Sequence, residues 1–203
     1  MTRAAADARP VTLGLLAGGQ GTRLGGVDKA WLLCDGQPQV VRLAALFPDV
    51  AEVLVSSNGP VAGYLPLGLR VIADATPGLG PVAGLAALAN ACQTPWLLTL
   101  PVDAVDPPVD LLGRLMDAAL AESGVAGAVV HDDEGLQPLA ALWATDVLAI
   151  HARTALAAGR LAVHQLVDAA RLRPAKLPGV LGNLNTFDDL EAARATLPDG
   201  GLR

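Results

Sequence analysis

A glycine-rich stretch near the amino terminus, Leu16–Lys29, has the residue types needed to bind a polyphosphate. Its glycines let backbone N–H groups come close to an anion, and Arg23 and Lys29 add two positive charges among them. Two cations fixed in this way suit a chain of phosphates better than a neutral ligand. The stretch therefore predicts a nucleotide-phosphate site, and the simpler alternative is a glycine-rich turn with two solvated cations.

Two common phosphate-binding loops are excluded by the residues present. A Walker A loop needs a Gly-Lys pair followed by Ser or Thr, and the chain contains no Gly-Lys pair. The dinucleotide fingerprint needs GxGxxG, but after Gly19 and Gly21 the place of the third glycine is taken by Leu24. A nicotinamide-dependent oxidoreductase therefore stays open only with a degenerate loop. The hydrolase elbow GxSxG is absent as well.

Two aspartates follow apolar runs that read as buried strands. Asp103 comes just after the run Trp96–Leu100, so we expect it at the carboxyl edge of a sheet, on the same side as the glycine-rich stretch. Because Mg²⁺ is usually held by one or two carboxylates together with substrate phosphate oxygens, Asp103 is a candidate metal ligand. Asp74 ends the run Leu69–Ala73. A turn or capping role is the alternative for both residues.

The remaining polar clusters carry weaker signals. The run Asp132–Glu134 is most simply a solvated hairpin turn. Cys34 and Cys92 stand far apart, and the three histidines lack a zinc-binding spacing, so neither a disulfide framework nor structural zinc is expected.

Apolar spacing predicts the elements that would bring these groups together. Strands are expected over Val11–Leu16, Val53–Ser56, Leu69–Ala73, Trp96–Leu100, Ala126–His131 and Pro138–Trp143. Helices are expected over Gln39–Leu46, Val82–Ala91, Val109–Ala121, Asp146–Ala157, Leu161–Ala170 and Asp188–Ala195, the last with Thr186 as its N-cap. Near-continuous apolar strands that alternate with helices are typical of a parallel sheet covered on both faces. We expect one α/β domain over residues 11–197, a flexible tail over 1–10 and a C-terminal tail over 198–203.

The composition argues against nucleic-acid and membrane partners. The 203 residues are 52% hydrophobic and 17% charged, as in a globular protein. Aromatic residues make up 3% and the formal net charge is −6, so we expect no nucleic-acid partner. No apolar run reaches the roughly 20 residues of a bilayer span, and no secretory signal is apparent, so we expect no membrane partner and a cytoplasmic location.

The glycine-rich stretch, LAGGQGTRLGGVDK, resembles the LAGGxSxRMGxDK loop of molybdenum cofactor guanylyltransferases. It is similar, less closely, to other nucleotidyltransferases. The resemblance runs from Leu13 to about Leu190 and includes three further motifs: Leu100–Asp103, with Val102 for the usual Cys, Gly80–Gly84, and Asn183–Thr186, followed by Phe187 in place of Pro. It implies a single-domain, Rossmann-like three-layer α/β sandwich of nucleotidyltransferase type with a mostly parallel sheet.

The resemblance also implies roles for individual residues. Nucleotide binding would involve Leu16, Ala17, Gly18, Gly19, Lys29, Asn58, Asp74 and Asp103. Arg23, Lys29 and Asp103 would be catalytic, with Asp103 holding Mg²⁺, and Arg160, Asn183 and Asn185 would lie on the acceptor side. Gly21 and Ser56 depart from the family pattern, and the residues leave open whether Ser56 or Asn58 contacts the nucleotide.

The implied reaction is transfer of GMP from GTP to the phosphate of the molybdenum cofactor (molybdopterin), with release of pyrophosphate. The partners would be GTP, the molybdenum cofactor and proteins that deliver it. The alternatives are a cytidylyltransferase acting on the same cofactor or on an alditol phosphate, a non-catalytic nucleotide-sensing module, and the oxidoreductase considered above.

Overall fold

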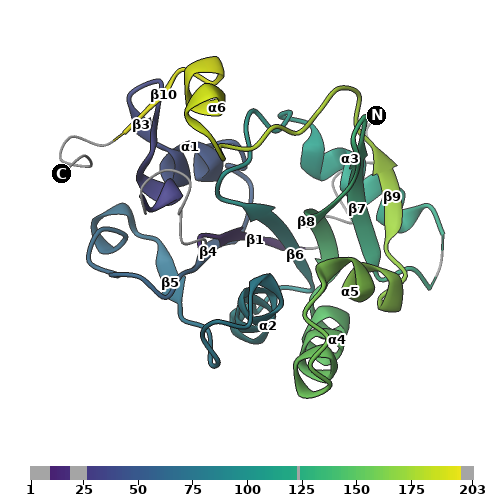
Figure 1. The fold of residues 1–203 in the computed structure, drawn as a ribbon. Coiled ribbons are helices and arrows are strands. Elements are labelled where there is room, and N and C mark those ends of the chain that lie inside the picture. The colour runs from purple at the N-terminus through teal and green to yellow at the C-terminus, as the bar shows by residue number, and fades with distance from the viewer. Residues whose placement is uncertain (1–9, 19–26, 123, 198–203) are drawn as a thin grey trace.

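A central sheet of seven strands carries the fold of the computed structural model, which describes residues 10–18, 27–122 and 124–197 (Figure 1). The strand order is β5-β4-β1-β6-β8-β7-β9, and β10-β2-β3 form a separate small sheet. The strands are β1 (Val11–Leu16), β2 (Leu33–Cys34), β3 (Gln37–Pro38), β4 (Glu52–Ser56), β5 (Arg70–Ile72), β6 (Trp96–Pro101), β7 (Gly127–Asp132), β8 (Gly135–Ala144), β9 (Arg173–Lys176) and β10 (Ala195–Thr196).

Helices connect these strands and cover the large sheet. The α-helices are α1 (Gln39–Ala45), α2 (Pro81–Ala91), α3 (Leu111–Leu120), α4 (Thr145–Ala157), α5 (Val163–Ala169) and α6 (Phe187–Ala192), and two short 3₁₀ helices are η2 (Lys29–Trp31) and η3 (Leu65–Leu67). Within the described ranges, none of these helices has the length and apolar character that a bilayer crossing demands.

Parallel pairing puts several strand ends at one edge of the sheet. Strand β1 pairs in parallel with β4 and β6, and β5 pairs in parallel with β4. Strand β8 is antiparallel to both of its neighbours, β6 and β7, which makes the sheet mostly but not wholly parallel. The carboxyl ends of β1, β4, β5 and β6 therefore lie together, as expected for the candidate site.

Alternate side chains of the strands feed two apolar layers, because successive residues of a strand point to opposite faces. Leu98 of β6 packs in the cluster that includes α1 and α3, whereas its neighbour Leu97 packs in the cluster that includes α2, α4 and α5. Gly14 of β1 lets α2 lie close, since a Cβ there would stand 3.0 Å from a methyl of Leu88. The result is the predicted three-layer α/β sandwich.

The last helix differs from its predicted extent. Thr186 is its N-cap as expected, in a capping box with Asp189, but α6 ends at Ala192. The prediction that this helix reaches Ala195 was wrong, because Ala195 is buried and pairs with Cys34 in the small sheet. A long-range pairing thus overrides the local helical pattern.

Asp132 also differs from its prediction as a solvated turn residue. The turn exists between β7 and β8, but Asp132 is only 3% exposed. Its carboxylate accepts hydrogen bonds from the backbone N–H groups of Leu181 and Glu134, both at 2.9 Å. Burial by itself would raise the pKa of Asp132, but hydrogen bonds from these groups and from Gln137 outweigh burial and leave the pKa below its ordinary value.

Candidate active site

A cleft of about 550 Å³ opens where the strand ends meet. Its lining comes mainly from the carboxyl ends of four strands with the residues that follow them, and from the start of α2. These residues are Leu16–Gly18 at the end of β1, Ser56 and Asn58 at the end of β4, Asp74 after β5, Pro101–Asp103 at the end of β6, and Pro81 and Gly84 of α2, together with Lys29. Such a crevice outside the carboxyl ends of parallel strands is the usual ligand site of open α/β sheets.

The side chain of Lys29 joins three distant parts of the chain at this cleft. Its Nζ donates hydrogen bonds to Oδ2 of Asp103 at 2.7 Å and to Oδ1 of Asn185 at 2.6 Å. The Lys29 and Asp103 side chains are 14% and 20% exposed, so their ion pair is only partly screened by water. A cation and a carboxylate, the charge types that bind phosphates and divalent metal ions, thus stand together at the cleft.

Backbone pairing brings Asn185 to Lys29. Leu184 donates its N–H to the carbonyl of Asp103 at 2.9 Å, and Asn183 forms a bridge with Ala104. The segment that follows β6 and the segment that precedes α6 therefore run side by side. Their pairing presents Asp103 and Asn185 to the same ammonium group.

Packing under Lys29 fixes the short helix η2. Asp28 caps this helix by accepting a hydrogen bond from the N–H of Ala30 at 3.0 Å. The rings of Trp31 and Tyr64 pack with centroids 4.8 Å apart, and a Cβ at Gly63 would stand 2.6 Å from the Trp31 ring. Burial raises the pKa of Tyr64 to about 12, and the negative charge of Asp28 adds to this rise. The Tyr64 hydroxyl therefore stays protonated near neutral pH.

A second polar group of the cleft centres on Asp74. Ser56 donates its hydroxyl to Oδ1 of Asp74 at 3.2 Å, and Asn58 donates its amide N–H to Oδ2 at 2.9 Å. The backbone N–H of Asp74 returns a hydrogen bond to Oδ1 of Asn58 at 2.9 Å. Both ends of the Asn58 amide are therefore engaged with Asp74.

Most of the residues predicted for the site lie at this cleft. Leu16, Ala17, Gly18, Lys29, Asn58, Asp74 and Asp103 line it, and Asn185 contacts Lys29. Asn183 lies next to the site through its bridge to Ala104. Arg160 is exposed just after α4 and is not part of the lining. Gly19 and Arg23 lie outside the described residues.

Some contributors carried no usable sequence signal. Leu139 of β8 and the turn residue Gly78 line the cleft, although neither belongs to a recognisable motif. The contact of Lys29 with Asn185 joins residues 156 positions apart. Only the tertiary pairing of the segment before α6 with the end of β6 reveals it.

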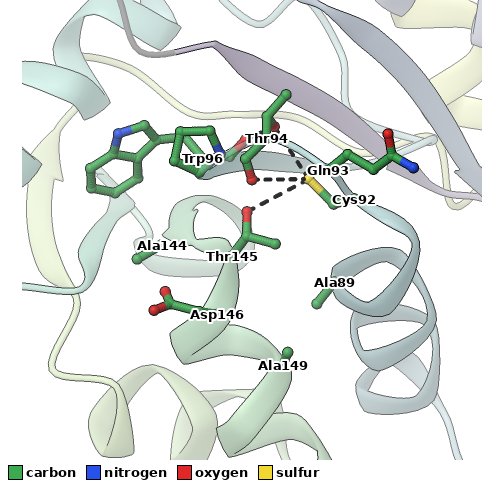
Figure 2. A pocket seen from close by; sticks show the side chains of 10 residues that line it. Ala89, Cys92, Gln93, Thr94, Trp96, Ala144, Thr145, Asp146 and Ala149 are labelled. Atoms are coloured by element: carbon green, nitrogen blue, oxygen red, sulfur yellow. Dashed lines mark hydrogen bonds between the residues drawn. The ribbon is translucent and has the colours of Figure 1, made fainter.

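A second cavity, of about 530 Å³, lies at the opposite edge of the sheet, where β6 begins and β8 ends (Figure 2). Sγ of Cys92 is 3.3 Å from Oγ1 of Thr94 and 3.6 Å from Oγ1 of Thr145. None of the predicted site residues that the structure describes lines this cavity, and its described lining lacks the paired cation and carboxylate of the cleft.

Together, the mostly parallel sheet and the strand-end cleft with its Lys-Asp pair define a nucleotide-binding α/β protein of nucleotidyltransferase type. Residues 14–174 match the family described as the MobA-like NTP transferase domain. The chain belongs to this family, and it is a nucleotidyltransferase.

Curated relatives bear the same kind of name. The chain is 34% identical over 200 residues to the molybdenum cofactor guanylyltransferase of Cupriavidus taiwanensis, an alignment that covers 89% of this chain and 94% of that protein. It is 37% identical to the molybdenum cofactor guanylyltransferase of Bordetella pertussis, over 70% of this chain and 75% of that protein. It is 43% identical to the molybdenum cofactor guanylyltransferase of Ralstonia nicotianae, over 61% of this chain and 63% of that protein.

Solved structures agree on the fold. Molybdopterin-guanine dinucleotide biosynthesis protein A from Archaeoglobus fulgidus has a TM-score of 0.68 at 21% identity, with 90% of this chain and 96% of that chain covered. The 2-C-methyl-D-erythritol 4-phosphate cytidylyltransferase from Thermus thermophilus has a TM-score of 0.65 at 21% identity, over 89% and 95%. A molybdopterin-guanine dinucleotide biosynthesis protein and a cytidylyltransferase thus share this architecture.

Proposed function

We propose that this protein transfers GMP from GTP to the phosphate of the molybdenum cofactor and releases pyrophosphate. The observation that carries the proposal is the contact of Lys29 with Asp103 at a strand-end cleft, in a chain of the MobA-like family. Relatives named molybdenum cofactor guanylyltransferase match up to 94% of their own length and supply the identity of the nucleotide and the acceptor.

The chemistry is a displacement at the α-phosphorus of GTP. An oxygen of the acceptor phosphate forms the new bond to phosphorus, and the bond from that phosphorus to the bridging oxygen of the β-phosphate breaks. Pyrophosphate leaves with the electron pair of that bond. Because the acceptor phosphate is already anionic at neutral pH, no side-chain base is needed, and catalysis consists of positioning and charge stabilisation.

Lys29 and Asp103 divide this work. Lys29, whose ammonium forms an ion pair with Asp103, would turn toward the phosphates and stabilise the charge that grows on the departing pyrophosphate. Arg23 would act on the same charge from the glycine-rich stretch. Asn185, already within hydrogen-bond distance of Lys29, would orient the ammonium from the acceptor side together with Asn183.

Asp103 would hold Mg²⁺, which would supply Lewis-acid stabilisation to the α- and β-phosphate oxygens. Within the part of the chain that the structure describes, no group of three or more His, Cys, Asp or Glu could hold a metal ion. One carboxylate that shares the ion with substrate phosphates is the usual arrangement for Mg²⁺, so the donor set fits.

Two further residues, Arg160 and Gly19, also have proposed roles. Arg160, exposed after α4, is the proposed contact for the acceptor phosphate, and Gly19 would continue the phosphate-binding backbone. We place the reaction in the cytoplasm, with proteins that deliver the labile acceptor as further partners.

The experiment that tests this proposal follows a label on the α-phosphate of GTP. The protein is incubated with Mg²⁺, GTP labelled at the α-phosphate and molybdenum cofactor, and label is expected on the cofactor with equimolar release of pyrophosphate. CTP in competition should displace little GTP. Label that stays on free nucleotide contradicts the proposal, and preferential transfer from labelled CTP assigns the chain to the cytidylyltransferases instead.

A further inference from the structure

Ser56 lies under the cleft and contacts the carboxylate of Asp74 from below. Its side chain is buried at 2% exposure, and its hydroxyl donates to Oδ1 of Asp74 at 3.2 Å. Asn58 holds the other oxygen, Oδ2, at 2.9 Å. Two donors from the end of β4 therefore fix both oxygens of one carboxylate at the surface of the cleft.

Helix α2 confines the Ser56 hydroxyl. Gly84, in the fourth position of this helix, faces Ser56, and a Cβ built there would stand 2.7 Å from Oγ of Ser56, 3.0 Å from a methyl of Leu16 and 3.6 Å from Cβ of Ser56. A side chain at position 84 would therefore displace the hydroxyl and also press on Leu16. The absence of a side chain at Gly84 is what leaves room for the contact between Ser56 and Asp74.

The fixed carboxylate retains capacity to accept hydrogen bonds. An ionised Asp offers about four acceptor positions, and Ser56 and Asn58 use one on each oxygen. About one position is left on each oxygen, the number that two parallel N–H donors would need. Among the common nucleobases only guanine offers such a pair, N1–H and the 2-amino group, whereas cytosine and adenine place a ring acceptor beside their single amino donor.

We propose that Ser56 is a positioning residue that sets the selectivity for guanine through the 2-amino group, by holding Asp74 in the orientation that accepts both donors. This inference rests on the proposed function, because it assumes that GTP occupies the cleft. In this proposal Ser56 acts through the Asp74 carboxylate, to which its hydroxyl donates. Without the Ser56 hydroxyl, only Asn58 holds the Asp74 carboxylate. The carboxylate then rotates about the Cβ–Cγ bond of Asp74 and accepts one N–H of guanine instead of two.

The test compares GTP with inosine triphosphate (ITP), which lacks only the 2-amino group. Dissociation constants of both nucleotides with Mg²⁺ are measured by calorimetry for the wild type and for Ser56→Ala. We expect the wild type to prefer GTP, and Ser56→Ala to reduce the ratio Kd(ITP)/Kd(GTP) by about 3- to 10-fold, the loss typical of one ordinary hydrogen bond.

Ser57→Ala is the matched control. Ser57 is equally buried, at 3% exposure, but its hydroxyl accepts a hydrogen bond from the N–H of Gly59 instead of binding Asp74. We expect this variant to keep the wild-type preference for GTP over ITP. An unchanged ratio in Ser56→Ala, or an equal loss in Ser57→Ala, overturns the proposal.

Gly84→Ala provides a second and independent route to the same contact. Its new Cβ should displace the Ser56 hydroxyl and reduce the GTP-to-ITP preference as Ser56→Ala does, while the helix itself gains propensity. In the double variant the loss should be no larger than in Gly84→Ala alone, because the contact between Ser56 and Asp74 is already broken in that variant. Additive losses contradict the proposal. A wild type that binds CTP as tightly as GTP refutes the proposed function, whereas a GTP-selective wild type with an insensitive Ser56 refutes this inference alone.

Discussion

At the scale of single residues, the site depends on one ammonium group that serves two partners. Lys29 binds Asp103 and Asn185 within 2.7 Å and 2.6 Å, and only 14% of its side chain is exposed. A compact ammonium with three rotatable donors can exchange one oxygen partner for another, which a planar guanidinium does less readily. The same group can therefore neutralise Asp103 without nucleotide and bind phosphate oxygens when nucleotide is present.

Removing either partner of this pair should slow the reaction without abolishing the fold. Lys29→Met and Asp103→Asn are each expected to lower kcat by roughly 10²- to 10³-fold, as for the loss of a charge-stabilising contact in other active sites. Pyrophosphate release at saturating substrate measures the effect. Lys176→Met, which changes an exposed lysine of β9, is the matched control and should leave kcat unchanged. Near-normal turnover in Lys29→Met would remove this residue from the mechanism.

At the scale of elements, the segment that precedes α6 is held at both ends. Asp132 accepts the N–H of Leu181, and Asp133 exchanges hydrogen bonds with the backbone of Gly179. Further along, the capping box of Thr186 and Asp189 begins α6. The intervening residues, among them Asn185, are thereby placed against the end of β6.

Replacing the buried carboxylate of this anchor should destabilise the fold in a pH-dependent way. Asp132→Asn turns an amide toward backbone N–H donors, and we expect a loss of about 1–3 kcal/mol in the free energy of unfolding at pH 7. Because hydrogen bonds lower the folded-state pKa of Asp132, its stabilisation is fully present above the unfolded pKa, about 3.9. It is lost as the pH falls from there through the folded pKa.

Urea unfolding at several pH values checks this expectation. The difference between wild type and Asp132→Asn should be largest at neutral pH and should shrink below about pH 4. Glu134→Gln, in the exposed part of the same turn, should show no such pH-dependent difference. A difference that grows as the pH falls would contradict the assignment.

At the scale of the whole molecule, the cleft is assembled from segments spread over most of the chain. Lys29, Asp103 and Asn185 come from its beginning, middle and end, and the small sheet pairs Cys34 with Ala195. The chain is therefore expected to unfold as one domain, and a nucleotide bound only to the folded state should stabilise all of it.

Single-tryptophan variants test this unity. Trp31 lies under the site, whereas Trp143 is fully buried in the sheet, so each reports on a different region. We expect their thermal transitions to coincide and to shift upward together with Mg²⁺ and GTP, by the equivalent of about 2.7 kcal/mol at 100 times Kd. Separate midpoints, or a shift seen by Trp31 alone, would show that the chain does not behave as one domain.

Local patterns were enough to predict the architecture and the centre of the site. The apolar runs that precede Gly18 and Asp103 predict strand ends at one sheet edge, because parallel strands share their direction, and these two residues do line one cleft. The N-cap at Thr186 was also readable, since capping depends on neighbours only a few residues away.

The errors and omissions came from long-range packing. Asp132 stands in a charged run that reads as solvated, yet the distant Leu181 buries it. Ala195 follows a helical pattern, yet it pairs with Cys34, and the contact of Lys29 with Asn185 has no local signature. Partners so far apart in sequence are chosen by the assembled fold, which single-chain periodicity does not describe.

The distance along the chain between Lys29 and Asn185 has a consequence for biosynthesis. The two residues are 156 positions apart, so at ordinary translation speeds roughly 8–30 s separate their synthesis. Throughout that interval the nascent polypeptide contains Lys29 but not Asn185, whose side-chain amide binds the Lys29 ammonium. Ribosome-bound chains should therefore bind nucleotide weakly. Full nucleotide binding should arise only after β10 has left the exit tunnel and paired with β2.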